Sequence, residues 1–196
     1  AVRNLELVTT LSGERKGSLL HCIDCTASAM GARLLRQRLL SPLTQVEPIR
    51  RRHDAVQAFF DDAPLRASIR ATLQATADLE RLATRTSLGV ASPRDLGAIR
   101  SCLERANELS RALTSDCSGS IDDTLRKLAP DDLCEDVQQE LATALVDEPP
   151  LSSGMGGIFR DDFDVRVAEL RELCTSSKDV LLRLEGHHVG KVETGS

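Results

Sequence analysis

The sequence predicts an all-α fold, a multi-helix bundle with a short irregular N-terminal connector and a long C-terminal helix. Apolar residues recur at steps of three and four over most of the chain, which is the periodicity of helices with one buried face. The 196 residues include four Phe but no Tyr and no Trp, so Leu, Val, Ile and Ala must fill the interior. This composition favours helix-on-helix packing over strand-rich architectures. The length suits one domain that buries roughly 70% of its unfolded surface, or two small subdomains.

Residues 1–27 are expected to form the connector. They contain a β-like stretch at residues 5–9, a Ser-Gly turn at residues 12–13, and an apolar run at residues 19–23 that should make about one helical turn. The helical domain should occupy residues 28–185, and residues 186–196 should form a polar tail.

Two helices are predicted next. The first runs from about residue 28 to residue 40 and is ended by Ser41 and Pro42. The second begins at a capping-box pattern made by Thr44 and Glu47. Its apolar positions keep a three-four rhythm that also includes His53, and they are Val46, Ile49, Val56 and Phe60.

The middle of the chain predicts a broken helix and then a continuous one. Residues 62–75 and 78–87 form one broken helix or two consecutive helices, ended by Gly89. Ser92, Pro93 and Asp95 place an N-cap, a first-turn Pro and a first-turn acid in the preferred order. The helix that follows should contact its neighbours along its whole length through Leu96, Ile99, Leu103, Ala106, Leu109 and Leu113.

The last third predicts three further elements. After a turn at residues 118–120 and a short helix through Leu125 and Leu128, another helix is expected with an apolar stripe at Leu133, Val137, Leu141 and Leu145. Residues 147–157 are rich in Pro, Gly and Ser and should form a loop or hairpin. A final helix at residues 164–185, about 33 Å long, should carry a seam of Phe163, Val167, Leu170, Cys174, Ser177, Leu181 and Leu184.

Charge and cysteine content exclude several classes of protein. A net charge of −5 argues against a free-standing nucleic-acid module, which needs a basic stripe, and the triplet Arg50, Arg51 and Arg52 is expected to be solvated. No signal-peptide pattern opens the sequence and no apolar run approaches the roughly 20 residues of a membrane span. We therefore expect a cytoplasmic protein whose six cysteines are reduced.

We predict no catalytic, cofactor-binding or metal-binding residue in this chain. Cys22 and Cys25 lie beside His21, but no second ligand pair follows, so they are expected to line the first helical turn as small apolar residues. His187 and His188 are adjacent and cannot share a helix face, and His53 is expected in the core. The acids Asp161, Asp162 and Asp164 lack the Gly and Glu of a calcium loop and better suit a helix N-terminus.

Residues 4–43 carry an ordered set of short motifs. They are Asn-Leu-Glu-Leu at 4–7, Gly-Ser-Leu at 17–19, Asp-x-Thr-x-x-x-Met-Gly-x-Arg-Leu-Leu at 24–35, and Leu-x-x-Pro-Leu at 39–43. This set resembles the opening of the helical core, or lever, domain of MutS-type mismatch repair proteins. Arg38 is the one departure, because the family usually has Trp there.

The resemblance continues along the chain in four further blocks. They are Arg-x-Asp-Ala-Val at 52–56, DLERLATR at 78–85, SPRDL at 92–96, and GGIFRDDFDVRVAELREL at 156–173. No single block is specific for this family, but the order and spacing of the blocks along the chain together are. The tail from Glu185 departs from the pattern, since the family carries the long helix on into a DNA-grasping clamp.

The resemblance implies a non-catalytic lever domain that couples the ATPase of a parent protein to its DNA clamp. It implies no cofactor in this chain, with ATP and Mg²⁺ bound elsewhere in the parent. The implied partners are the parent's other domains, and mismatched DNA and a MutL-type protein through the full-length dimer. The chain has neither the Gly-x-x-x-x-Gly-Lys-Ser/Thr loop of such an ATPase nor the Phe-x-Glu wedge of a mismatch reader.

Two hypotheses of other classes stay open. The first is a self-contained helical adaptor that binds a partner helix along the seam from Phe163 to Leu184. The second is a small metal hydrolase, which would need a ligand set that the sequence does not display.

Overall fold

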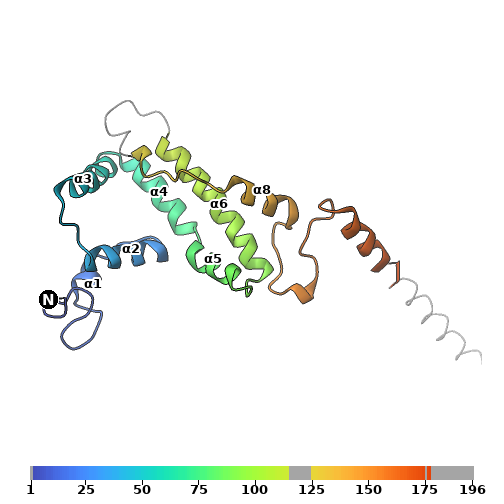
Figure 1. Cartoon of the computed structure of the whole chain (residues 1–196), viewed down its shortest axis with the longest axis horizontal. Helices are drawn as coiled ribbons and strands as arrows, with labels where there is room; N and C mark the ends of the chain where they lie inside the picture. Colours follow the sequence, from blue (N-terminus) through green and yellow to red (C-terminus); the bar gives the residue numbers. More distant parts are fainter. Residues whose placement is uncertain (1, 115–124, 175, 178–196) are drawn as a thin grey trace, which may run out of the picture.

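The fold is helical throughout the part of the chain that the structure describes. In the computed structural model this part comprises residues 2–114, 125–174 and 176–177, and helices joined by turns make up most of it (Figure 1). Within these ranges no strand forms, and the only β-type contact is an isolated antiparallel bridge between Leu145 and Phe159. The predicted all-α class is confirmed.

The connector ends in helix α1, Leu19–Ile23, which is capped by the buried Ser18. The β-like stretch predicted at residues 5–9 is wrong, because these residues form turns and bends. The carbonyl of Leu7 accepts instead from the amide of Leu20 at 2.9 Å. The stretch is therefore tied to the start of a helix and pairs with no strand.

Helix α2, Ala29–Leu40, has the predicted bounds, with Ser28 as its N-cap. None of its residues is buried, and Leu34 on its predicted apolar side is 45% exposed. Helix α2 therefore lies at the edge of the body, where apolar packing alone does not hold it.

Helix α3, Val46–Asp61, differs from the prediction at its start and in its buried side. It begins at Val46 with Gln45 at the cap position, so Thr44 lies outside the cap and makes no capping bond. The side chains of Val46, Val56 and Phe60 are 62%, 67% and 74% exposed. His53, expected in the core, is exposed as well. The helix contacts α4, and its one buried residue is Ala58, outside the predicted stripe.

Helices α4, Ala63–Ala75, and α5, Leu79–Ser87, are two consecutive helices, the second of the two forms that the sequence allows. Asp62 and Asp78 cap them by accepting from amides of their first turns. Gly89 follows α5 with a φ of +69°, a left-handed conformation that favours glycine, so the predicted stop is confirmed.

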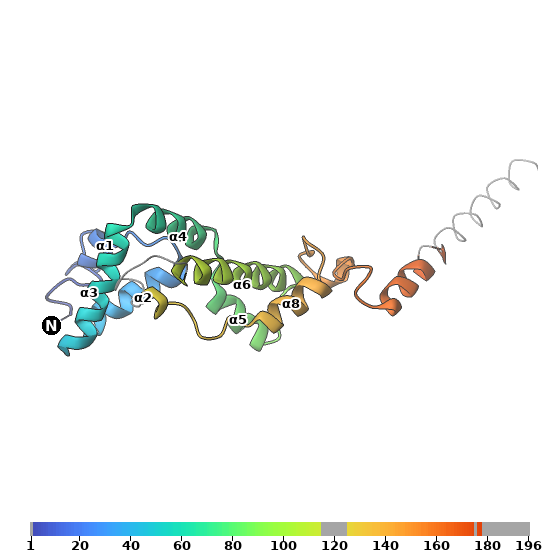
Figure 2. The same cartoon turned by 90° about the horizontal axis from the view of Figure 1, so that it is seen from above.

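Helix α6, Pro93–Thr114, occupies the centre of the body. It lies against α4, α5 and α8 (Glu135–Ala144), as the views in Figures 1 and 2 show. The predicted helix is confirmed, and its buried residues lie in its first half, at Gly97, Arg100, Cys102 and Leu103. Over the described residues, the buried apolar side chains are Leu20, Ala58, Leu82, Cys102, Leu103, Leu125, Ala144 and Leu145.

The segment after α8 forms the predicted hairpin. The amide of Val146 donates to the carbonyl of Ile158 at 3.0 Å, and the amide of Arg160 donates to the carbonyl of Ala144 at 2.9 Å. A short 3-10 helix, η1, Ser153–Met155, lies near its tip. The turn predicted at residues 118–120 and the cysteine at 117 fall outside the described residues.

The final helix is described over residues 165–174 and 176–177. It projects from the end of the elongated body opposite the N-terminus (Figure 2). Its predicted continuation to residue 185 falls outside the described residues and stays a prediction, as do the three domain boundaries. In the described part, no helix is both long enough and apolar enough to cross a membrane.

Truncation of the α6 core should destabilise the whole body. Leu103 is 7% exposed at the centre of the helix packing, so Leu103→Ala is expected to lower the free energy of unfolding by about 2–5 kcal/mol. Urea unfolding followed by circular dichroism measures this loss. The matched control is Leu88→Ala, because Leu88 is 70% exposed and its truncation should change stability by less than about 0.5 kcal/mol. Equal losses in both variants would contradict the described core.

Candidate functional site

The polar contacts that fasten α2 to the body begin in the loop before it. Asp24 accepts from both the amide and the hydroxyl of Thr26, at 3.2 and 2.7 Å, and forms an ion pair with Arg15 at 2.6 Å. The hydrogen bonds from Thr26, helped by Arg15, lower the pKa of the Asp24 carboxyl. A Cβ at Gly31 would lie 3.6 Å from the Cβ of Thr26 and 3.2 Å from the Oγ of Ser28. The loop and the first turn of α2 therefore pack closely.

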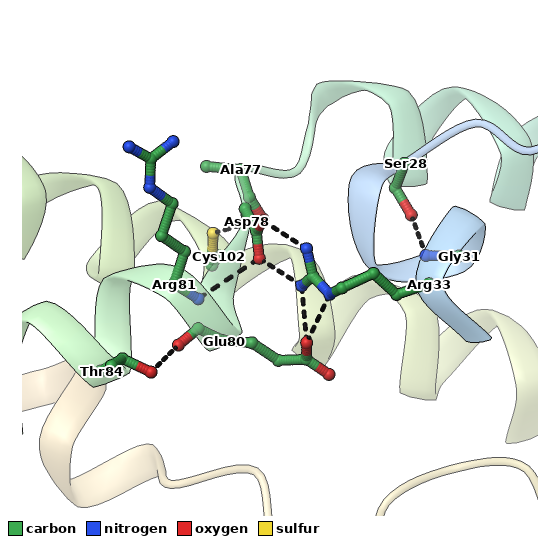
Figure 3. Close-up of polar contacts among 9 residues, drawn as sticks. All are labelled: Ser28, Gly31, Arg33, Ala77, Asp78, Glu80, Arg81, Thr84 and Cys102. Carbon is green, nitrogen blue, oxygen red and sulfur yellow. Dashed lines mark hydrogen bonds and ion pairs between the residues drawn. The ribbon is translucent and has the colours of Figure 1, made fainter. Parts of the chain in front are cut away.

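Helix α2 presents Arg33 to the start of α5, where its guanidinium binds two carboxylates (Figure 3). Its Nη1 and Nη2 donate to the two oxygens of Asp78, both at 2.7 Å. Its Nε and Nη2 donate to one oxygen of Glu80 at 2.9 and 2.5 Å. We call these three residues the α2–α5 clamp. The planar guanidinium suits this arrangement because its donors match paired carboxylate oxygens.

Asp78 has two roles in the α2–α5 clamp. Its Oδ1 accepts from Arg33 and also from the amide of Arg81 at 3.3 Å, which caps α5. The hydrogen bonds from Arg33 are the main cause that lowers the pKa of the Asp78 carboxyl, while partial burial opposes them. The same ion pairs raise the pKa of the Arg33 guanidinium. The clamp is therefore charged at neutral pH.

The clamp is connected to α6 by one buried thiol. Cys102 is 1% exposed, and its Sγ lies 3.6 Å from the carbonyl oxygen of Ala77, directly before Asp78 (Figure 3). Burial raises the pKa of this thiol, so it stays protonated and can donate to the carbonyl. A second tie joins the connector to α4, where Nη1 of Arg70 donates to the carbonyl of Cys25 at 2.8 Å.

Arg100 on α6 fastens the end of α8. It is 9% exposed and donates to the carbonyls of Leu145, Val146 and Asp147, at 3.3, 3.2 and 2.8 Å. The last carbonyls of a helix have no partner within it and carry partial negative charge. Leu145 is the C-cap of α8, and Val146 and Asp147 begin the hairpin, so the buried guanidinium fixes both the cap and the start of the hairpin.

The approach of the hairpin to α6 depends on Gly97. A Cβ at this buried position would lie 3.0 Å from Cδ and Cγ of Pro149. Any larger residue would push the hairpin away.

The predicted cap of α6 is confirmed. The Oγ of Ser92 accepts from the amide of Asp95, and the carboxylate of Asp95 accepts from the amide of Ser92.

The candidate ligand residues considered in the sequence make no side-chain contact in these ties, and Cys25 enters one of them only through its backbone carbonyl. Cys22 and Cys25 are exposed and so do not line the first turn as expected. Asp164 accepts from the amide of Arg166 at 2.8 Å, as suits an acid at a helix N-terminus. No group of three or more His, Cys, Asp or Glu suited to a metal forms among the described residues. His187 and His188 lie outside that part.

Sequence reasoning missed the α2–α5 clamp and the Arg100 tie. Arg33, Asp78 and Glu80 do stand in two of the quoted motif blocks, but they are 45 and 47 residues apart. The only signal was their presence in those blocks, and spacing cannot show that they meet. Arg100 falls between two apolar positions of its helix, and nothing in the sequence distinguishes it from a solvated arginine.

Loss of the α2–α5 clamp should make stability less dependent on pH. Because the folded-state pKa of Asp78 is depressed, its contribution is full above the unfolded pKa of about 3.9 and is lost as pH falls through the folded pKa. Arg33→Gln should therefore lower the melting temperature at pH 7, and the difference from the unsubstituted chain should shrink below about pH 4.

Thermal melts between acidic and neutral pH measure this difference. Arg36→Gln is the matched control, because Arg36 is an exposed arginine on the same helix. A melting difference that is constant over this range would show that the ion pairs do not hold α2.

Comparisons with known proteins identify what the chain is similar to. The family model described as MutS domain III matches residues 1–188. The DNA mismatch repair protein MutS of Rhodopseudomonas palustris (strain BisB5) is 42% identical over 192 residues, which are 98% of this chain and 21% of that protein. The proteins of the same name from Azorhizobium caulinodans and Salinibacter ruber are 43% and 40% identical, over 98% and 93% of this chain and 20% of each of them. The chain thus spans about a fifth of the length of these relatives.

Proposed function

The chain belongs to the MutS domain III family, and from this premise we propose that it is the lever domain of a DNA mismatch repair protein. In this role it couples the nucleotide state of an ATPase to the grip of a clamp on DNA. The support is the family, together with one structural observation, a continuous series of contacts that runs from α2 to the last helix.

The series begins at the α2–α5 clamp and passes through the Cys102 thiol into α6. Two residues before Cys102 on the same helix, Arg100 holds the carbonyls at the end of α8. The bridge between Leu145 and Phe159 follows, and Nη2 of Arg171 in the last helix donates to the carbonyl of Phe159 at 2.7 Å. Each joint links a helix to the next, so a movement of α2 is transmitted to the hairpin.

Coupling between two sites requires a stiff element and a place where two arrangements exist. Helix α6, with 22 residues and a length of about 33 Å, is packed on three helices and serves as the stiff element. The α2–α5 clamp suits the changeable joint, because α2 buries no residue and the side chains of Arg33 and Glu80 are 48% and 69% exposed.

The proposal includes the surroundings of the domain. We place ATP and Mg²⁺ in other parts of the parent protein and treat this chain as non-catalytic. Mismatched DNA and a MutL-type partner would be met through a full-length dimer in the cytoplasm. The support is the name of the relatives, DNA mismatch repair protein MutS, and the lack of a Gly-x-x-x-x-Gly-Lys-Ser/Thr sequence in these 196 residues.

Breaking the α2–α5 clamp in the full-length protein should uncouple ATP from DNA release. For Arg33→Gln, mismatch binding without nucleotide and the ATPase rate should stay within about twofold, while ATP-stimulated release of DNA should slow about fivefold or more. Fluorescence anisotropy of labelled mismatched DNA measures release.

Two variants make the coupling test specific. Arg36→Gln should behave like the unsubstituted protein, and exchange of the charges in Arg33→Asp with Asp78→Arg should restore part of the response. A normal ATP response of a folded Arg33→Gln protein would refute the lever role of the clamp.

The adaptor hypothesis is favoured by one observation on the last helix. Phe163 and Leu170, two positions of the predicted seam, are 44% and 62% exposed. An open seam should cause concentration-dependent association. Size-exclusion chromatography over a protein concentration of about 1–100 μM should therefore show a shift to larger species. The substitution Leu170→Ser should abolish this shift. A single monomeric elution volume throughout would count against self-association through this seam.

A further inference from the structure

An open apolar groove lies between the start of α6 and the hairpin after α8. Its volume is about 410 Å³, and its lining includes Val90, Leu96, Leu145, Leu151, Ile158 and Phe159. Leu145 at its base is 2% exposed and is fixed by the Arg100 tie and by its bridge to Phe159. The groove is therefore built on the rigid part of the body.

Large apolar side chains surround the groove without protein cover. Leu151 and Met155 on the hairpin are 62% and 71% exposed. Phe159 and Phe163 stack on each other with ring centroids 5.5 Å apart and 12° between planes, and remain 41% and 44% exposed. Exposed apolar residues gathered in this way are typical of interaction sites. The stacked rings provide an aromatic contact whose geometry is already set.

The hairpin around this surface is strongly acidic. Residues 145–164 contain five acids and one arginine, a local charge of −4. Arg160 is already occupied, since its Nη1 lies 3.0 Å from Asp147 and its Nε lies 4.0 Å from Asp162. The side chains of Asp147 and Asp162 are 86% and 87% exposed. Asp161 pairs in turn with Arg171 of the last helix, which leaves the hairpin with more acids than arginines. The apolar lining of the groove is thus bordered by an acidic segment.

We infer that this groove binds a basic amphipathic helix, with the apolar side of the helix against Leu151 and Phe159 and its lysines and arginines toward the hairpin acids. Helices bind in apolar grooves through residues spaced three and four apart, and opposite charge around the groove sets their specificity and their rate of association. Nucleic acid is disfavoured because its phosphates would meet like charge.

A second copy of this chain is a poorer occupant for the same reason. A symmetric contact through the groove would bring one acidic hairpin against another, and like charges opposed in an interface weaken it. The inference concerns the side chains that line the groove, whereas the lever role uses backbone contacts of the same hairpin, so the two can hold or fail separately.

Two designed peptides test the inference on the 196-residue chain. Both peptides have roughly 18 residues, about five helical turns, and carry Leu at three-four spacing. They differ only at the remaining positions, which are Lys and Arg in the basic peptide and Glu in the acidic peptide. We expect the basic peptide to bind at least about tenfold more tightly than the acidic one in fluorescence anisotropy. The difference should narrow as salt is raised, because screening weakens exposed charge pairs.

Variants distinguish the groove from other apolar surfaces. Leu151→Ser should weaken binding of the basic peptide about tenfold, and Glu148→Gln with Asp162→Asn should reduce the preference between the peptides. Phe60→Ser is the matched control, because Phe60 is 74% exposed on α3, away from the groove.

Four outcomes would overturn the inference: equal binding of the two peptides, no binding of either, a loss of binding in Phe60→Ser but not in Leu151→Ser, or a concentration-dependent dimer of the chain that Leu151→Ser abolishes. The last outcome would assign the groove to a second copy. None of them bears on ATP-stimulated release of DNA in the full-length protein, so the failure of this inference is separable from failure of the lever role.

Discussion

The packing of α6 against α4, α5 and α8 is the constraint on which the rest of the structure depends. Helices approach closely where the residues between them are small, because protein interiors are close-packed. Cys102 and Gly97 meet this condition on α6, the first below the start of α5 and the second below Pro149 of the hairpin. The helix can approach its neighbours because these two positions carry little or no side chain.

Arginine side chains make the contacts between elements that the apolar core does not provide. Arg33, Arg70 and Arg100 each cross from one element to another and bind carboxylates or backbone carbonyls there. The carbonyls at and just after the helix caps have no partner within a helix, and the guanidinium has enough donors to bind several of them. The body is therefore held by apolar contact at its centre and by directional polar contacts at its ends. Among these arginine contacts, the exposed α2–α5 clamp can rearrange more readily than the buried contacts of Arg100.

Local patterns in the sequence were enough to predict the helices and most of their ends. The periodicity of α6 and the cap at Ser92 are local features, and the structure confirms them. The α2–α5 clamp and the contacts of Arg100 could not be predicted from the sequence. Their partners are about 45 residues apart and meet only once the helices have packed. For α3, periodicity identified the helix but not its buried side, since Val56 and Phe60 are exposed while Ala58 is buried. An apolar stripe shows that a surface favours burial, and only the fold shows whether this chain supplies the cover.

That distinction bears on the two apolar surfaces that stay open at the two ends of the molecule. The stripe of α3 belongs to a helix with three arginines and three acids, whereas the hairpin after α8 has five acids and one arginine in residues 145–164. Charge around an apolar surface sets the specificity of its contacts. The groove therefore suits a basic segment, whereas the α3 stripe, without net charge, does not select its neighbour by the sign of its charge. Similar apolar patterns can thus place different demands on what covers them, and those demands depend on the charges that the fold brings beside each stripe.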